Sequence, residues 1–141
     1  MGHVIDHEGI NFDRNRLQKI IEFPLPETQK ELKSFLGLAN YVRDNCEDTS
    51  GHTRLLNVMI HGYSKKTKNQ KVPWTDESRQ AFTSVQKMVN NAQKLFYIRE
   101  DATGIHLYTD ASQYGIGASL VQIVDGKEQV VLLMFCNYRC M

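Results

Sequence analysis

The sequence predicts an α+β fold, with helices in the first two-thirds of the chain and strands in the last third. Between residues 13 and 89 apolar residues recur at helical spacing, and from Ile105 onward they alternate as in strands. With 141 residues, of which 41% are hydrophobic and 23% charged, the chain suits one domain of ordinary size or two small pieces. This composition lies in the globular range and argues against global disorder.

The chain begins with a predicted hairpin and a short helix. Residues 2–6 alternate in polarity and turn at Glu8-Gly9, as short antiparallel arms do. Asp13 can cap a first helix. Pro24 and Pro26 end it, because proline cannot continue a helix.

Three further helices follow. Thr28 and Glu31 form a capping box, the clearest helix start in the chain. Thr75 can cap another helix, whose first turn carries Asp76 and Glu77, and acidic groups there suit the helix dipole. The apolar residues that mark the four helices are Leu17, Ile20 and Ile21; Leu32, Phe35, Leu36, Ala39 and Val42; Leu55, Leu56, Val58 and Met59; and Ala81, Phe82, Val85, Met88 and Val89.

The last third predicts a three-stranded antiparallel meander. Its strands are expected at residues 105–110, 115–124 and 128–135, with a hairpin turn at Asp125-Gly126. Such a meander leaves an edge unpaired and one face in need of cover, and we expect the helix that Thr75 begins to cover part of it. The apolar run at residues 130–135 predicts an aggregation risk at an open edge. We expect the chain to be a truncated piece of a larger fold.

Composition and charge exclude several classes of protein. There is no apolar run of the ~20 residues that a membrane helix needs, and the first residues lack the layout of a signal peptide. We therefore expect no membrane partner and an intracellular location, cytoplasmic or nuclear. The net charge of +1 is lower than that of a dedicated nucleic-acid binder. However, the chain crowds four lysines into one short stretch: Lys65, Lys66, Lys68 and Lys71. These lysines can neutralise phosphates, or they can simply form a solvated loop.

The three cysteines are Cys46, Cys136 and Cys140, an odd number without a C-x-x-C pair. They are expected to be reduced thiols. A zinc site made of Cys136 and Cys140 with His61 or His106 is the alternative, and no usual ligand spacing supports it.

Lys33, Gly37 and Tyr41 recur every four residues and so share one face of the second helix. Since the apolar residues lie on another face, this stripe is free to meet a partner. Lysine can contact phosphates, glycine lets a backbone come close and tyrosine can pack on a sugar or base. In the alternative, Lys33 is solvated, Tyr41 belongs to the core and Gly37 permits tight helix packing.

Four blocks of the sequence resemble the polymerase polyproteins of gypsy-like long-terminal-repeat retrotransposons and their retroviral relatives. They are residues 1–5, residues 28–41, Trp74-Thr75 followed by Ala81-Phe82, and residues 108–118, in the order and spacing of that family. The resemblance implies a primer-grip-like hairpin at 1–12 and thumb-like helices at 13–62. A lysine-rich loop and connecting helix at 63–100 and a truncated RNase H-like domain at 101–141 would follow.

The resemblance also implies a site. The parent proteins are RNA-directed DNA polymerases with ribonuclease H activity, and their thumb follows the minor groove of a template–primer duplex, RNA/DNA or DNA. The implied nucleic-acid-binding residues are Gly2, His3, Lys33, Gly37, Tyr41, Lys65, Lys66 and Lys68. Asp110 matches the first of four ribonuclease H carboxylates, which together hold two Mg²⁺ ions.

The remaining carboxylates and the polymerase aspartates have no match in this chain. We therefore expect the chain alone to be inactive and to bind no Mg²⁺ tightly, unless it assembles with the missing palm and RNase H parts. The alternative is a domesticated or relic protein-interaction module without catalysis. Residues 46–53 and 130–141 depart from the family pattern, which puts the end of the meander in doubt.

Overall fold

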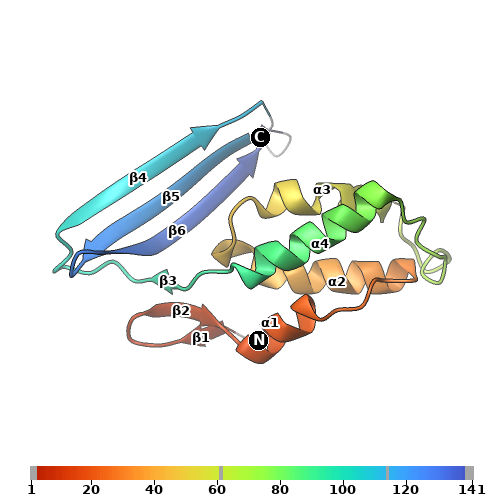
Figure 1. Ribbon diagram of the computed structural model, residues 1–141, viewed down its shortest axis with the longest axis horizontal. Coiled ribbons are helices and arrows are strands. Elements are labelled where there is room, and N and C mark those ends of the chain that lie inside the picture. The colour runs from red at the N-terminus through yellow and green to blue at the C-terminus, as the bar shows by residue number, and fades with distance from the viewer. Residues whose placement is uncertain (1–2, 61, 114, 139–141) are drawn as a thin grey trace.

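The computed structural model describes residues 3–60, 62–113 and 115–138. Its helices pack together in one bundle, and a long three-stranded sheet stands beside them (Figure 1). The elements follow the order β1 (His3–Ile5), β2 (Gly9–Phe12), α1 (Arg14–Ile21), α2 (Gln29–Tyr41), the short 3-10 helix η1 (Arg43–Asn45), α3 (Thr49–Met59), α4 (Asp76–Asn90), β3 (Leu95–Phe96), β4 (Gly104–Ala111), β5 (Gly115–Val124) and β6 (Lys127–Asn137). The predicted α+β class and the consecutive antiparallel meander β4-β5-β6 are confirmed.

The helices α1, α2 and α4 begin where the sequence predicts. Asp13 accepts a hydrogen bond from the backbone of the first turn of α1, and Thr28 and Glu31 form both hydrogen bonds of their capping box. Thr75 caps α4 in the same way. Asp48 caps α3 from a left-handed backbone conformation, with φ of 44°, which the sequence did not signal. No helix within the described ranges has the length and apolar character that crossing a bilayer requires.

One apolar core holds the helical bundle together. Phe35 is fully buried in it, with its ring centroid 4.5 Å from that of Phe82 and 5.4 Å from that of Phe23. Removing such side chains from water is the main force that stabilises the bundle. The buried core residues are Ile20, Leu32, Phe35, Leu36, Ala39, Val42, Cys46, Leu56, Val72, Phe82, Val85, Met88 and Val89.

Two polar side chains fix the proline-containing segment between α1 and α2. The side-chain amide of Gln86 donates to the carbonyl groups of Ile20, Ile21 and Phe23 over 3.3, 2.8 and 3.1 Å. The indole nitrogen of Trp74 donates to the carbonyl of Pro26 over 2.6 Å. The bonds of Gln86 reach carbonyl groups at and just beyond the end of α1, where a helix leaves its last carbonyls without partners within the helix.

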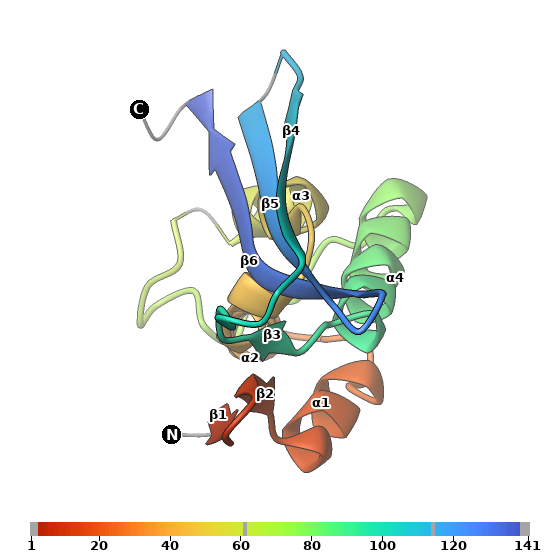
Figure 2. The same ribbon diagram turned by 90° about the vertical axis from the view of Figure 1, so that its left-hand side faces the viewer.

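The N-terminal hairpin gains a third strand that the sequence did not predict. β3 pairs with β2, so that the small sheet has the order β1-β2-β3, and it lies between the hairpin and the meander in Figures 1 and 2. The Lys94 ammonium lies 2.9 Å from a carboxylate oxygen of both Asp6 and Glu8. This hydrogen bond from Lys94 lowers the pKa of Asp6 to about 2.

The meander follows the expected register. β4 and β5 pair without interruption, and Asp125 and Gly126 both have positive φ, as the predicted tight hairpin turn requires. An irregularity opposite Leu120 and Val121 interrupts the pairing of β5 with β6. Gln122 is fully buried and holds the incoming segment, because it accepts from the Arg99 amide and donates to the Tyr97 carbonyl, each over 2.9 Å.

The two faces of the meander differ. One faces α3 and α4, and α3 and η1 approach β6 on that side. On the other face Ile105, Leu107, Leu132 and Met134 are each more than half exposed. We expected α4 to cover part of the sheet, but a cleft separates α4 from it.

Candidate nucleic-acid interface

The stripe on α2 is open at its centre. Lys33 and Gly37 are exposed, and a Cβ atom added at Gly37 would meet no heavy atom within 4 Å. The alternative that Gly37 permits tight helix packing is therefore wrong for the described part of the chain. The apolar residues Leu32, Phe35 and Leu36 turn to the core instead. The middle of the stripe can thus meet a partner's backbone closely.

Tyr41 ends the stripe where three elements converge. Its ring centroid lies 4.7 Å from that of His3 on β1, and the Arg16 guanidinium of α1 lies 5.2 Å from the same centroid. Tyr41 is half-buried, so the interpretation of it as a core residue holds only in part. Its hydroxyl has no hydrogen-bond partner among the described residues. The fold therefore brings the N-terminal hairpin to the end of the stripe.

Lys33 lies at the other end of the stripe, beside the lysine-rich loop. Its ammonium sits 4.2 Å above the centre of the Tyr63 ring, which is a favourable position for a cation. The backbone amides of Gln29 and Lys30 donate to the carbonyls of Gln70 and Lys68, and these bonds fasten the loop to the start of α2. The loop lysines Lys65, Lys66 and Lys68 are exposed.

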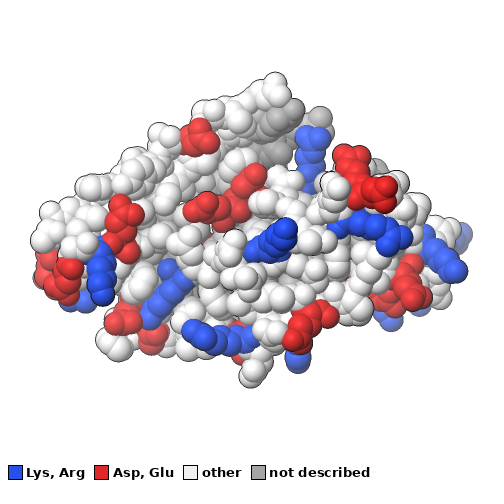
Figure 3. All heavy atoms as spheres, in the orientation of Figure 1, with Lys and Arg blue, Asp and Glu red and all other residues white. Residues whose placement is uncertain are grey.

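Charge alone does not single out this surface. In the view of Figure 3 basic and acidic side chains are interspersed, in keeping with the net charge of +1. A nucleic-acid interface on this chain would therefore depend on the local arrangement of Lys33, Tyr41 and the lysine-rich loop, and not on a large basic field.

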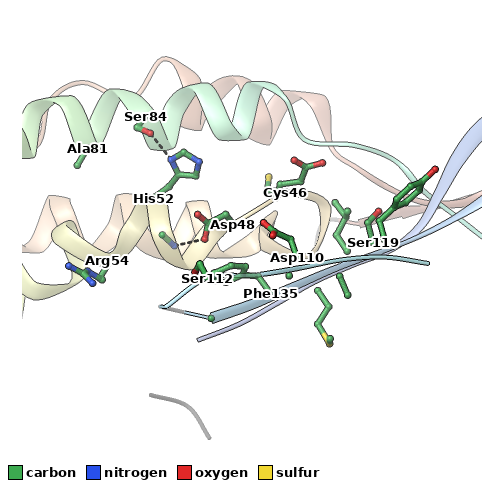
Figure 4. A pocket seen from close by; sticks show the side chains of 18 of the residues that line it. Cys46, Asp48, His52, Arg54, Ala81, Ser84, Asp110, Ser112, Ser119 and Phe135 are labelled. Carbon is green, nitrogen blue, oxygen red and sulfur yellow. Dashed lines mark hydrogen bonds between the residues drawn. The ribbon is translucent and has the colours of Figure 1, made fainter. Parts of the chain in front are cut away.

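Asp110 occupies a different place, near the end of β4. It opens toward a cleft of about 960 Å³ between the meander and the helices α3 and α4 (Figure 4). The cleft wall also carries the carboxylates of Glu47, Asp48 and Glu77. Arg54 lines the cleft as well, but the four carboxylates outnumber it, so the charge of the cleft does not favour phosphate groups. Asp110 and the Lys33 stripe are thus separate features.

The donors around Asp110 do not fit a pair of Mg²⁺ ions. Across residues 3–60, 62–113 and 115–138, no group of three histidine, cysteine or acidic side chains could hold a metal. Mg²⁺ needs several oxygen ligands in near-octahedral positions. Asp48 already accepts a hydrogen bond from the Gly51 amide over 2.9 Å as the cap of α3. We derive no metal-dependent step for this chain.

Three residues of the sequence predictions lie outside the described residues: Gly2, His61 and Cys140. Of the other suggested zinc ligands, His106 lies on β4 opposite Val121 and Cys136 on β6 opposite Ile116, five positions apart along β5. Sequence reasoning missed the contact between His52 Nδ1 and Ser84 Oγ, 2.5 Å apart, which joins α3 to α4 at the cleft. These two residues are 32 positions apart, and no local motif joins them.

Comparison with known proteins shows what the chain is similar to. The chain is 32% identical over 136 residues to the retrovirus-related Pol polyprotein from transposon opus of Drosophila melanogaster, covering 93% of this chain and 14% of the polyprotein. Residues 74–139 match the model of an RNase H-like domain found in reverse transcriptase. This stretch is an RNase H-like region of the retrotransposon Pol type. The resemblance predicted from the four sequence blocks is confirmed.

Other relatives agree. The Pol polyprotein from transposon gypsy of Drosophila melanogaster is 28% identical over 127 residues, covering 86% of this chain and 12% of the polyprotein. The transposon Tf2-3 polyprotein of Schizosaccharomyces pombe is 29% identical over 122 residues, covering 86% of this chain and 9% of the polyprotein. The chain thus spans less than a sixth of the length of these polyproteins. The family match begins at Trp74, so α4 belongs to the matched stretch together with the meander.

Solved structures share the fold. The chain superimposes on a foamy viral protease-reverse transcriptase in complex with double-stranded DNA with a TM-score of 0.73, at 21% identity, covering 98% of this chain and 23% of that one. The structure of the foamy viral protease-reverse transcriptase with an RNA/DNA hybrid gives the same TM-score, and this chain covers 18% of the foamy viral chain. At this identity the likeness establishes the fold of the Pol segment.

Proposed function

We propose that this Pol segment binds the template–primer duplex, RNA/DNA or DNA, of a reverse transcriptase/RNase H protein. The observation that carries the proposal is the exposed stripe on α2, open at Gly37 and flanked by cations at both ends. The matching foamy viral enzymes were solved with DNA and with an RNA/DNA hybrid, which supports a duplex as the ligand. We also propose that the segment works inside the cell, in the cytoplasm or nucleus.

The geometry of α2 suits a groove. Lys33 and Tyr41 are eight residues apart, so the stripe is about 12 Å long at the ~1.5 Å rise of a helix. This length is roughly a third of one turn of a duplex, which is about 34 Å long. Lys33 would contact a phosphate, Gly37 would let the sugar–phosphate backbone approach, and Tyr41 would pack on a sugar. His3, with Gly2, would lie toward the primer end.

The lysine-rich loop extends this surface. Lys65, Lys66 and Lys68 are exposed, and the loop is fastened to the start of α2. If these lysines and Lys33 each neutralise one phosphate, the slope of log K against log salt is about −3.6, at roughly −0.9 per phosphate. A solvated loop without such contacts would leave the slope near −1.

We further propose that the segment retains the order of parts implied by the family. Residues 1–12 would act as the primer-grip hairpin, 13–62 as the thumb and 63–100 as the connection. Residues 101–141 would be the first part of the RNase H domain. The segment would complete a catalytic site only together with the palm and the remaining RNase H strands and helices.

The proposal includes inactivity of the isolated chain. Asp110 is one carboxylate of a site whose Mg²⁺ ions need several. Within the described residues no group of three acidic, histidine or cysteine side chains could hold a metal ion. We expect no cleavage of a labelled RNA/DNA hybrid by the purified chain in Mg²⁺. Cleavage that disappears in Asp110→Asn would overturn this part of the proposal.

Fluorescence anisotropy with a short labelled RNA/DNA hybrid across a salt series tests duplex binding. We expect binding that weakens steeply with salt and that is lost in Lys33→Glu. Lys127→Glu is the matched control, since it makes the same charge change at an exposed residue at the β5–β6 turn. No binding of the wild-type chain at low salt would favour the alternative, a relic or domesticated protein-interaction module.

A further inference from the structure

We propose that Arg16, on α1, is a further phosphate-binding residue of the same interface and that the Tyr41 ring positions it. This inference rests on the proposed duplex binding and adds a residue from α1, a helix that holds none of the nucleic-acid-binding residues that the resemblance implies. Its ligand is the phosphodiester backbone of the duplex, at the end of the stripe opposite to the lysine-rich loop.

The guanidinium of Arg16 is free to meet a ligand. Its central carbon lies 5.2 Å from the centroid of the Tyr41 ring, and the side chain is exposed. Within the described residues this ring contact is its only side-chain interaction. Its five N–H donors therefore have no acceptor among the residues that the structure describes, and their planar fork matches the two oxygens of a phosphate.

Tyr41 fixes where this guanidinium lies. The tyrosine is half-buried and its ring also contacts the His3 ring, with centroids 4.7 Å apart, so it is held between β1 and α1. A ring clamped in this way gives Arg16 a defined surface to rest on. The Tyr41 hydroxyl itself is buried and lacks a hydrogen-bond partner in the described chain, so it is the ring that meets Arg16.

Other arginines nearby lack this arrangement. Arg43, just beyond the end of α2, is paired with Asp44 over 3.2 Å, which offsets its charge. Arg14 is exposed on the same helix as Arg16, but two residues along a helix point about 200° apart at 3.6 residues per turn. Arg14 has no ring contact in the described structure, so it is a matched control for charge, helix and exposure.

At each end of the stripe a cation lies over a tyrosine ring. At one end the Lys33 ammonium rests on Tyr63, and at the other the Arg16 guanidinium rests on Tyr41. Each cation is thus placed by an aromatic ring, with the open Gly37 between them. Two positioned cations that flank a close approach suit the two phosphate strands that border a groove.

The test compares Arg16→Gln with Arg14→Gln by anisotropy on the labelled RNA/DNA hybrid across a salt series, with thermal unfolding as a check of folding. We expect Arg16→Gln to weaken binding by about tenfold at low salt. The slope of log K against log salt should shrink by about 0.9, the share of one phosphate contact. Arg14→Gln should stay within about twofold of the wild-type affinity.

Arg16→Lys gives a second test that keeps the charge. It should preserve the salt slope but weaken binding several-fold, because an ammonium cannot form the paired contacts of a guanidinium. Equal binding by Arg16→Gln and Arg14→Gln, while Lys33→Glu abolishes binding, would overturn the role of Arg16 and leave the proposed function standing. If Arg16→Gln does not fold, Arg16→Lys with wild-type affinity would overturn it. No binding by the wild-type chain would overturn both.

Discussion

Replacing Gly37 by alanine should stabilise the fold and weaken duplex binding at the same time. Gly37 lies inside α2, where glycine is less favourable than alanine by roughly 0.5–1 kcal/mol. No neighbour lies within 4 Å of a new Cβ atom, so the structure offers no clash to offset this gain. We expect the melting temperature to rise by roughly 2–5 °C for a chain of this size.

The same methyl group should reduce affinity for the duplex. In the proposed interface Gly37 lies where the sugar–phosphate backbone comes closest to the helix, so a side chain there separates the two surfaces. We expect a loss of about fivefold for Gly37→Ala and a larger loss for Gly37→Leu. The assays are thermal unfolding by circular dichroism and anisotropy on the labelled hybrid, with the same protein samples.

Asn57→Ala is the matched control. Asn57 is exposed on α3, and alanine there should stabilise that helix by about 0.5–0.7 kcal/mol through the same propensity effect. It should leave binding unchanged. A destabilised Gly37→Ala would show that the glycine is packed against a neighbour and refute our description of the surface. A stabilised Gly37→Ala with wild-type affinity would refute the role of Gly37 in close approach.

Three further predictions concern stability and pH. Phe35→Ala should lower the free energy of unfolding by about 3–5 kcal/mol in urea titrations, because it opens a cavity at the centre of the core beside Phe82; a loss below 1 kcal/mol would contradict this. Gln86→Leu should lower the free energy of unfolding by about 1–3 kcal/mol in the same assay, since it leaves the carbonyls at the end of α1 without their donor. An unchanged urea midpoint would show that water replaces the Gln86 amide as the donor. The pKa of Asp6 in the folded chain, about 2, lies below its value in the unfolded chain. The stabilisation that Asp6 adds to the free energy of unfolding is therefore present above about pH 4 and is lost as the pH falls toward 2. In Lys94→Met the free energy of unfolding should depend less on pH between about pH 4 and pH 2. The same pH dependence as in the wild type would show that the ion pair does not form.

Local signals explain what the sequence predicted correctly. The capping box of Thr28 and Glu31 acts within four residues, and the turn at Asp125-Gly126 needs only two residues with positive φ. For this reason the starts of α2 and α4 and the hairpin of the meander could be placed from the chain alone. The exposed stripe of Lys33 and Gly37 likewise follows from helical periodicity.

Contacts between distant segments could not be predicted in this way. β3 has only two residues, too few for a periodic signal, and it is a strand because β2 lies beside it. The pairing of Arg16 with Tyr41 depends on how α1 crosses α2, and the cleft at Asp110 depends on how the meander stands against α3. Such features arise from tertiary packing, which leaves no pattern in either segment by itself.

The exposed apolar face of the meander agrees with the expectation that one face of such a sheet needs cover. Leu107, Leu120 and Leu132 follow one another across the three strands, and the two outer leucines are more than half exposed. The predicted aggregation risk of the apolar run in β6 stays a prediction. β3 approaches this strand and so covers part of it.

The central claim is that the stripe on α2 contacts the duplex. The most direct measurement is a titration of the ¹⁵N-labelled chain with the RNA/DNA hybrid, followed by amide chemical shifts in NMR spectra. We predict that the largest shifts occur at Lys33, Gly37 and Tyr41 and extend to Arg16, with β4–β6 unchanged. Shifts confined to the meander or to the cleft at Asp110, or no shifts at low salt, would contradict the claim.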